Sequence, residues 1–251
     1  MFPVRKGKTS QRGSLRLLLE RPGPFLRGRM LDRPNRFTLL VRMGQGVERV
    51  HLPDPGALRT VLAPGREVLC ERREGTGRKT RLTALAVRVG RIYVMVDSSL
   101  ANPLFARALE EGLLPELRGS RILFREKTMG EGRLDFVLEG AEGERSYVEV
   151  KSCTHVEEGV AKFPDRPTER GRRHLRLLRG LSRRGERAYL FFVIQRPDAR
   201  VLRPFGEVDP EFSVELWRAK EEGVLLRAFS ILFRPPRLHF WRRVRVEVLP
   251  P

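Results

Sequence analysis

The segment from Ala188 to Gln195 is a nearly continuous apolar run that ends in a glutamine. A run of this length is too short to span a membrane and is typical of a central β-strand that is covered on both faces. Covering both faces of a strand takes packed layers on each side of its sheet. The run therefore constrains the second half of the chain to a layered fold that contains helices.

Two helices with apolar faces are predicted earlier in the chain than this run, over Asn102 to Leu117 and over Arg170 to Arg184. Asn102 is expected to be the N-cap of the first helix, because it precedes Pro103. Further elements are predicted as strands over 121–127, 134–138 and 147–151, a helix over 210–222 and a terminal strand over 238–249. The order of helix, three strands, helix and strand predicts an α/β (α+β) domain with a mixed sheet.

The first 90 residues have a different pattern, in which short β-rich segments alternate with turn signals. The segments are 37–42, 48–52, 67–72 and 82–89, and Gly or Pro residues separate them. This spacing favours a small closed β-barrel of the OB type, with an unspecialised small basic β-domain as the alternative. We therefore divide the chain into a basic tail (1–14), an OB-like domain (15–90) and an α/β domain with a C-terminal strand extension (91–251).

The charge of the chain limits its partners. The 251 residues contain 50 Lys and Arg against 31 Asp and Glu, a net charge of +19. The first 90 residues contain 20 of the basic residues and only 7 of the acidic ones, so most of the excess lies in the basic tail and the predicted barrel together. Such a field attracts polyanions, and nucleic acid is the expected partner. No secretory or membrane-spanning segment is apparent, so a cytoplasmic location without membrane contact is expected.

Two carboxylates and a lysine form the strongest candidate for chemistry. Asp135 begins one predicted strand, and Glu149 and Lys151 lie on the next, two residues apart and therefore on one face. If the two strands are adjacent and antiparallel, the carboxylates meet at one end of the sheet. With the Val150 carbonyl they would form an all-oxygen site for Mg²⁺ (or Mn²⁺), and Lys151 could orient a water or offset phosphate charge.

A chain with this many Glu and Lys residues is expected to contain a Glu-x-Lys triplet by chance, so the triplet alone is weak evidence. A solvated strand of alternating charges is therefore an equal alternative. Glu126 on the preceding strand is either a third, outer metal ligand or an exposed glutamate paired with a basic neighbour. Cys153 and His155 lack a third ligand at metal spacing and are interpreted as structural. Gln195 either supports the site through its amide or is an ordinary residue at a strand end.

Arginines in both predicted domains are candidates for contacts with phosphates. In the barrel they flank Asn35, beside Phe37, which is expected in the core rather than as a platform for base stacking. In the second domain, His174 follows Arg170 by four residues and shares its helix face. It is either a phosphate contact or proton carrier, or a surface histidine without such a role. The residues assigned to nucleic-acid binding are Arg29, Arg33, Arg36, Arg133, Arg170, Arg172 and His174.

Several segments also resemble the sugar fermentation stimulation protein A family, in the same order along the chain. They begin at Arg33 (RPNRF), His51 (HLPDPG), Asn102 (NPL), Arg133 (RLDF), Tyr147 (YVEVKS), Phe163 (FPD) and Thr168 (TERG), and His174 follows. The resemblance implies an OB-like domain joined to a nuclease-like domain of the PD-(D/E)xK, or restriction-endonuclease-like, type that binds DNA. It places Asp135, Glu149 and Lys151 on the signature positions. Members usually carry Asn where this chain has Asp54.

These observations lead to three hypotheses. The first is a Mg²⁺-dependent nuclease that hydrolyses DNA or RNA, in which Asp135 and Glu149 hold the metal and Lys151 assists the nucleophile. The second is a DNA-binding transcriptional regulator of sugar metabolism with an idle nuclease fold. The third is a basic scaffold or assembly protein for polyanionic partners such as ribosomes. Pairing of two copies to cut two strands is left open by the sequence.

Overall fold

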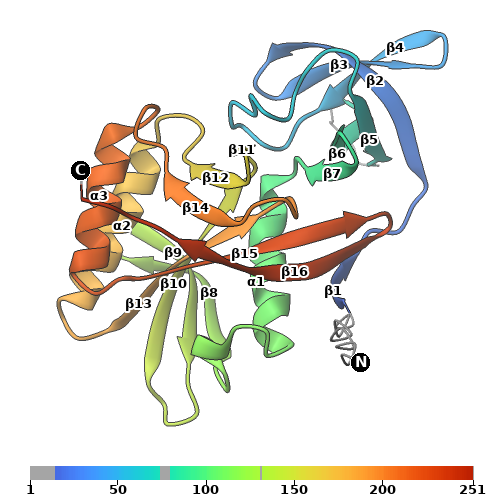
Figure 1. Cartoon of the computed structure of the whole chain (residues 1–251). Helices are drawn as coiled ribbons and strands as arrows, with labels where there is room; N and C mark the ends of the chain where they lie inside the picture. Colours follow the sequence, from blue (N-terminus) through green and yellow to red (C-terminus); the bar gives the residue numbers. More distant parts are fainter. Residues whose placement is uncertain (1–14, 74–79, 131, 251) are drawn as a thin grey trace, which may run out of the picture.

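The computed structural model describes residues 15–73, 80–130 and 132–250, so the predicted basic tail lies outside the described residues. The described chain forms two β-sheets, each with its own apolar core (Figure 1). Within these ranges no helix is long and apolar enough to cross a membrane.

The smaller sheet is the predicted barrel. Its strands are β2 (Phe25–Asn35), β3 (Thr38–Met43), β4 (Gly46–His51), β5 (Glu67–Arg72), β6 (Leu82–Val89) and β7 (Ile92–Met95). Strands β2 to β6 follow the order β4-β3-β2-β5-β6, and parallel pairing of β4 with β6 closes the ring. Alternate residues such as Leu39, Val41 and Val50 fill its interior. The prediction of an OB-like five-stranded barrel is confirmed.

The larger sheet is mixed, as predicted, with the order β11-β12-β14-β16-β15-β13-β10-β9-β8 and β1 beside β16. Parallel pairs join β10, β13 and β15, whereas β8, β9 and β10 pair antiparallel. The strands are β1 (Arg16–Glu20), β8 (Arg121–Met129), β9 (Gly132–Glu139), β10 (Arg145–Cys153), β11 (Val156–Glu157), β12 (Val160–Phe163), β13 (Arg187–Ile194), β14 (Val201–Pro204), β15 (Leu225–Arg234) and β16 (Arg237–Val246).

Helices cover both faces of this sheet, as the apolar run of β13 requires. Helix α1 (Ala101–Glu110) lies on one face, and α2 (Glu169–Ser182) and α3 (Pro210–Glu221) lie on the other (Figure 1). Neighbouring residues of β13 point to opposite faces: Phe191 packs against Phe105 of α1, whereas Phe192 packs against Phe163 on the side of α2. The α+β fold class is confirmed.

The first helix differs from its predicted bounds. Helix α1 begins at Ala101, because the Asp97 side chain caps a 3₁₀ turn (Ser98–Leu100) that leads directly into it. Asn102 is therefore inside the helix, and the prediction that it is the N-cap is wrong. The helix stops at Glu110 because Gly112 adopts a positive φ of 66°, a conformation that ends helices.

Two strands do not follow the domain boundary that was expected at residue 90. Strand β7 follows that boundary yet pairs with β6 of the barrel, because Val94 and Met95 are buried against it. Strand β1 precedes the barrel yet pairs with β16 of the larger sheet, where Leu18 joins the core beneath α1. From β1 onward, the described chain thus runs from the larger sheet into the barrel and then back to the larger sheet.

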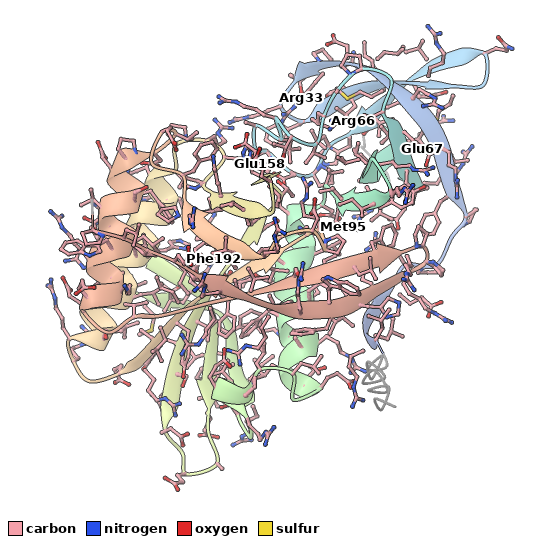
Figure 2. The ribbon with its side chains drawn as sticks, viewed as in Figure 1. Arg33, Arg66, Glu67, Met95, Glu158 and Phe192 are labelled. Carbon is pink, nitrogen blue, oxygen red and sulfur yellow. The ribbon has the colours of Figure 1, made fainter. Side chains whose placement is uncertain are left out.

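A continuous contact joins the barrel to the larger domain. Leu69, Leu85 and Met95 of the barrel belong to the same apolar cluster as Phe191 and Phe229, and Figure 2 shows Met95 where the two units meet. Hydrogen bonds also join the two domains. The Met95 N–H donates to the Gln195 carbonyl (3.1 Å). The Leu58 N–H donates to Asp165 (2.9 Å), and the Arg166 side chain donates to the Pro55 carbonyl (3.0 Å). The loop 53–58 of the barrel is thereby held against the loop at Asp165.

Asp54 is buried at this junction. Its Oδ1 accepts a hydrogen bond from the Gly56 N–H (2.8 Å). Burial raises the pKa of Asp54 to about 6, and the nearby Asp165 adds to the rise, although the Gly56 N–H lowers it. A Cβ on Gly56 would lie 2.6 Å from an Asp165 oxygen, so only glycine fits between the two carboxyl groups. The junction therefore carries one carboxyl group that destabilises the fold when ionised.

Replacing this carboxyl group should alter the pH dependence of stability. Because the pKa of Asp54 is higher in the folded than in the unfolded chain, its contribution to stability is full below about pH 4 and is lost as pH rises through about 6. Asp54→Asn keeps the acceptor for Gly56 without the charge. We expect its stability gain over the wild type to be about 1 kcal/mol larger at pH 8 than at pH 5, or about 2–4 °C in Tm.

Thermal unfolding in EDTA at the two pH values measures this difference. Other titrating groups are common to both proteins and cancel in the comparison. A gain that is equal at pH 5 and pH 8 would contradict a raised pKa of Asp54.

Candidate active site in the fork between two strands

The site forms where β9 and β10 separate. Their antiparallel pairing runs from Glu139 and Arg145 to Phe136 and Val148 and stops there, while β10 stays paired with β13 as far as Cys153. Beyond the last pair, the Val150 N–H has no backbone acceptor on β9 and donates instead to the side-chain Oδ2 of Asp135 (2.8 Å). The predicted meeting of Asp135 with the Glu149 strand thus occurs at a fork in the sheet.

Asn102 holds the other oxygen of Asp135. Its Nδ2 donates to Asp135 Oδ1 (2.8 Å) from the first turn of α1, so the carboxylate is fixed by one backbone and one side-chain donor. The sequence analysis assigned no site role to Asn102. The signal was present in the Asn102-Pro-Leu segment, but it was interpreted as a helix cap.

Glu149, Lys151 and His174 form a hydrogen-bonded cluster beside this pair. Lys151 Nζ donates to Glu149 Oε1 (2.6 Å), and His174 Nδ1 from α2 contacts the same oxygen. Arg170 Nε donates to His174 Nε2 (3.4 Å), which fits the tautomer with its proton on Nδ1. His174 is buried rather than on the surface, and through this contact it positions the Glu149 carboxylate, whereas a contact of His174 with phosphate stays a prediction.

The two carboxyl groups differ in their electrostatic surroundings. Burial raises the pKa of Asp135, and the negative charge of Glu149 raises it further. Burial also raises the pKa of Glu149, but the charge of Lys151 and the hydrogen bond with His174 together outweigh it, so that pKa is lowered. Glu149 is thus held ionised in a buried position, and its charge opposes ionisation of Asp135.

One oxygen of Glu149 lacks a partner. Glu149 is only 2 % exposed, and its Oε2 accepts no hydrogen bond in the part of the chain that the structure describes. A buried carboxylate oxygen without a donor is costly, and a cation is one partner that would satisfy it. Mg²⁺ is commonly held by one or two protein carboxylates, with waters and substrate phosphates completing its shell. The donor set of Asp135 and Glu149 fits such an ion.

Glu126 does not join this pair. It lies at the edge of the same cavity, but its side chain is 64 % exposed and its carboxylate pairs with Arg133 (3.3 Å). Across residues 15–73, 80–130 and 132–250, no three His, Cys, Asp or Glu side chains are grouped closely enough to hold a metal. The structure favours the alternative that the sequence left open, a glutamate paired with a basic neighbour.

The site opens into a cavity of about 920 Å³ between the two domains. The barrel contributes Arg36, Pro55 and Gly56 to its wall, and the larger domain contributes Arg133, Asp135, Glu149, Lys151, Asp165, Arg166 and Arg170 among others. Arg36, Arg133 and Arg170, three of the residues assigned to nucleic-acid binding, therefore lie in one cavity wall with the carboxylates. Asp165 and Arg166 were missed, because their position depends on the docking of the barrel.

The other predicted arginines are engaged elsewhere. Arg33 donates to the carbonyls of Gly56 (2.7 Å), Ala57 (2.8 Å) and Arg36 (3.0 Å), and burial lowers its pKa. Arg172 pairs with Asp209 (2.8 Å), which ties α2 to α3. Arg33 and Arg172 thus support the fold at these positions, and their predicted contact role is not what the geometry favours.

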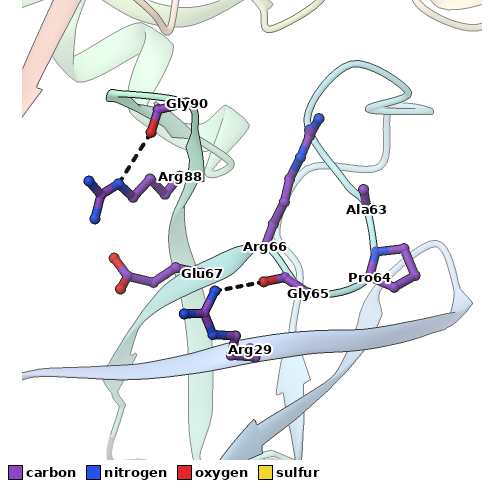
Figure 3. A pocket seen from close by; sticks show the side chains of 8 residues that line it. All are labelled: Arg29, Ala63, Pro64, Gly65, Arg66, Glu67, Arg88 and Gly90. Atoms are coloured by element: carbon purple, nitrogen blue, oxygen red, sulfur yellow. Dashed lines mark hydrogen bonds between the residues drawn. The ribbon is translucent and has the colours of Figure 1, made fainter.

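Arg29 lies in a separate hollow of about 550 Å³ on the barrel, together with Arg66 and Arg88 (Figure 3). Its guanidinium donates to the Gly65 carbonyl (3.0 Å). Phe37 was expected in the core, and that prediction is wrong: the ring is 41 % exposed, with the Arg36 guanidinium 4.9 Å from its centroid. Phe37 lies in the turn between β2 and β3, outside the strand positions whose side chains fill the barrel interior.

Gln195 supports the site indirectly, through residues next to the cavity. Its Nε2 donates to the Asp97 carbonyl (2.9 Å) and to the Ser152 hydroxyl (2.7 Å), which couples the end of β13 to the start of α1 and to the cavity wall. Cys153 is buried, and burial raises its pKa to about 12, which agrees with a structural role.

Comparison with known proteins gives one consistent assignment. Residues 31–96 match the SfsA N-terminal OB domain, and residues 99–237 match the sugar fermentation stimulation protein RE domain. The chain is 42 % identical to a sugar fermentation stimulation protein homolog of Methanothermobacter thermautotrophicus, over 86 % of this chain and 88 % of the relative. A homolog of Moorella thermoacetica is also 42 % identical, over 92 % of this chain and all of that one.

A solved structure, described as Pyrococcus furiosus SfsA in complex with Ca²⁺, superposes with a TM-score of 0.85 at 33 % identity. The alignment covers 92 % of this chain and 99 % of that protein. The family match spans both domains and more than half of the residues. The chain therefore belongs to the sugar fermentation stimulation protein family.

Proposed function

We propose that this protein is a divalent-metal-dependent nuclease that hydrolyses phosphodiester bonds in DNA or RNA. The observation that carries the proposal is the Glu149 carboxylate, which is held ionised by Lys151 and His174, keeps one buried oxygen without a donor, and lies beside Asp135. A relative whose structure is described as a complex with Ca²⁺ supports a cation at this fold.

In this proposal Asp135 and Glu149 hold Mg²⁺ or Mn²⁺, which supplies positive charge opposite the phosphate. Asn102 and the Val150 N–H fix the Asp135 carboxylate, and His174 fixes Glu149. The Lys151 ammonium, beside Glu149, orients the attacking water and stabilises the charge that develops on the phosphate oxygens.

The proposed substrate is nucleic acid because of the charges around the cavity. Arg36, Arg133, Arg166 and Arg170 all lie in its wall, in a chain of net charge +19. Arginines at such positions contact phosphates without reading bases, which suits DNA and RNA equally. The exposed Phe37 beside Arg36 offers a face on which an unpaired base could stack.

Cleavage assays with Lys151→Ala test the assignment. With Mg²⁺ or Mn²⁺, we expect the wild type to cleave labelled single-stranded or double-stranded DNA or RNA, and EDTA to abolish cleavage. Loss of the ammonium should lower the rate by about 10²–10³-fold, the usual effect of removing one stabilising donor. Lys220→Ala on α3 is the matched control and should retain full activity, since Lys220 lies outside the cavity.

Equal cleavage by the wild type and Lys151→Ala would indicate a contaminating nuclease and would contradict the site. Tight binding without cleavage by the wild type under any metal would instead favour a DNA-binding regulator with an idle site.

Two arginines of α2 should separate binding from stability. Arg170 lines the cavity, so Arg170→Ala should weaken nucleic-acid binding and reduce its salt dependence by about one phosphate contact. Arg172→Ala should leave binding unchanged but remove the charge partner of the buried Asp209. We expect a loss of about 2 kcal/mol, or about 4–8 °C in Tm, because two backbone N–H groups still bond Asp209.

Fluorescence anisotropy and thermal melts on the same protein preparations measure both effects. If Arg172→Ala weakened binding as much as Arg170→Ala at an unchanged Tm, the division of roles along α2 would be wrong.

A further inference from the structure

A second basic hollow adjoins the candidate active site on the larger domain. It measures about 950 Å³ and lies between α2 and residues 128–130 and 132–133, where β8 ends and β9 begins. Five arginines line it, and the described residues of its wall include no Asp or Glu. We call it the arginine groove and define it by Arg133, Arg170, Arg173, Arg176 and Arg184.

The groove is continuous with the active-site cavity. Arg133 and Arg170 line both, and His174, which contacts Glu149, also lines the groove. A nucleic-acid strand with one phosphodiester at Glu149 would therefore have its neighbouring phosphates beside the groove. The barrel forms another part of the cavity wall, so it does not cover this side.

Helix α2 separates its arginines into two groups. Arg172, Arg179 and Arg183 pair with acidic residues of α3 and its flanking turns, namely Asp209, Glu215 and Glu222. The side chains of Arg173 and Arg184 are exposed in the groove and form no ion pair or hydrogen bond within the described residues. Of the other groove arginines, Arg176 pairs with Glu169 (2.8 Å) and Arg133 with Glu126 (3.3 Å), so Arg173 and Arg184 carry charges that the described residues leave unpaired.

Like charges left unpaired on one surface repel one another, and a polyanion relieves that repulsion.

The hollow on the barrel shown in Figure 3 is a weaker candidate for binding a polyanion. There Arg29 and Arg88 donate to the carbonyls of Gly65 and Gly90, and the wall includes Glu67.

We propose that the arginine groove binds the phosphate backbone of the nucleic-acid strand on one side of the bond to be cleaved. Arg173 and Arg184 make contacts that the active-site residues do not make, and they read no bases. The proposal rests on the proposed function only in placing the scissile bond at Glu149.

The test compares two double variants, each built on Lys151→Ala so that substrate stays intact. Arg173→Gln/Arg184→Gln removes two groove charges. Arg118→Gln/Arg234→Gln removes two exposed arginines that line none of the described cavities and have no side-chain partner within the described residues. All four arginines are exposed, so thermal melts should match the parent.

Binding of labelled 30-nucleotide strands and 30-base-pair duplexes is measured by anisotropy from about 50 to 300 mM KCl. Loss of two phosphate contacts should lower the slope of log affinity against log salt by about 1.4 for single strands or 1.8 for duplexes. At 0.1 M salt this corresponds to about 25-fold or 60-fold weaker binding. The control double variant should keep the slope of the parent.

An unchanged slope in the groove variant overturns the proposal, and so does an equal fall in both double variants, which would indicate a general effect of net charge. Absence of binding by the parent also overturns it. Cleavage by the protein with Lys151 intact is measured separately. A groove effect without cleavage would refute the nuclease and leave the groove as a binding surface, whereas cleavage without a groove effect would refute only the groove.

Discussion

The hydrogen bond from the Val150 N–H to Asp135 Oδ2 is the contact on which the arrangement of the site depends. Where two strands separate, the freed N–H of a buried strand needs an acceptor, and an unsatisfied donor there costs about 1–3 kcal/mol. Asp135 supplies the acceptor from the departing strand itself. The same bond that ends the β9–β10 ladder therefore fixes a carboxylate next to Glu149, so that the fold and the site share one interaction.

The remaining contacts distribute charge around this fork. Asn102 reaches Asp135 from α1, and His174 reaches Glu149 from α2, so helices on opposite faces of the sheet both position the site. Lys151 keeps Glu149 ionised, while Glu149 Oε2 has no hydrogen-bond donor within the described residues. On α2, Asp209 and Glu215 pair with one set of arginines, whereas the side chains of Arg173 and Arg184 have no charge partner within the described residues. Unpaired positive charge therefore lies next to the cavity that holds the two carboxylates.

Much of this could be predicted from the sequence, where period and local spacing decide structure. The apolar run of β13 predicted a sheet covered on both faces, and the turn signals of the first 90 residues predicted a closed barrel. The neighbouring positions of Asp135 and Glu149 followed from antiparallel pairing. What failed depends on tertiary contact: β1 pairs with the last strand, more than 200 residues away, and its own pattern does not indicate this. Arg33 and Arg172 were assigned from charge alone, but buried partners decide their roles.

The central claim is that Asp135 and Glu149 together hold a divalent cation. An anomalous difference map from crystals grown with Mn²⁺ tests it most directly, because the scattering of the metal identifies its position without reference to activity. We expect a peak at the fork, coordinated by one oxygen of Asp135 and by Oε2 of Glu149, the buried atom that has no donor within the described residues. A fully occupied Mn²⁺ elsewhere, with no peak at the fork, would contradict it.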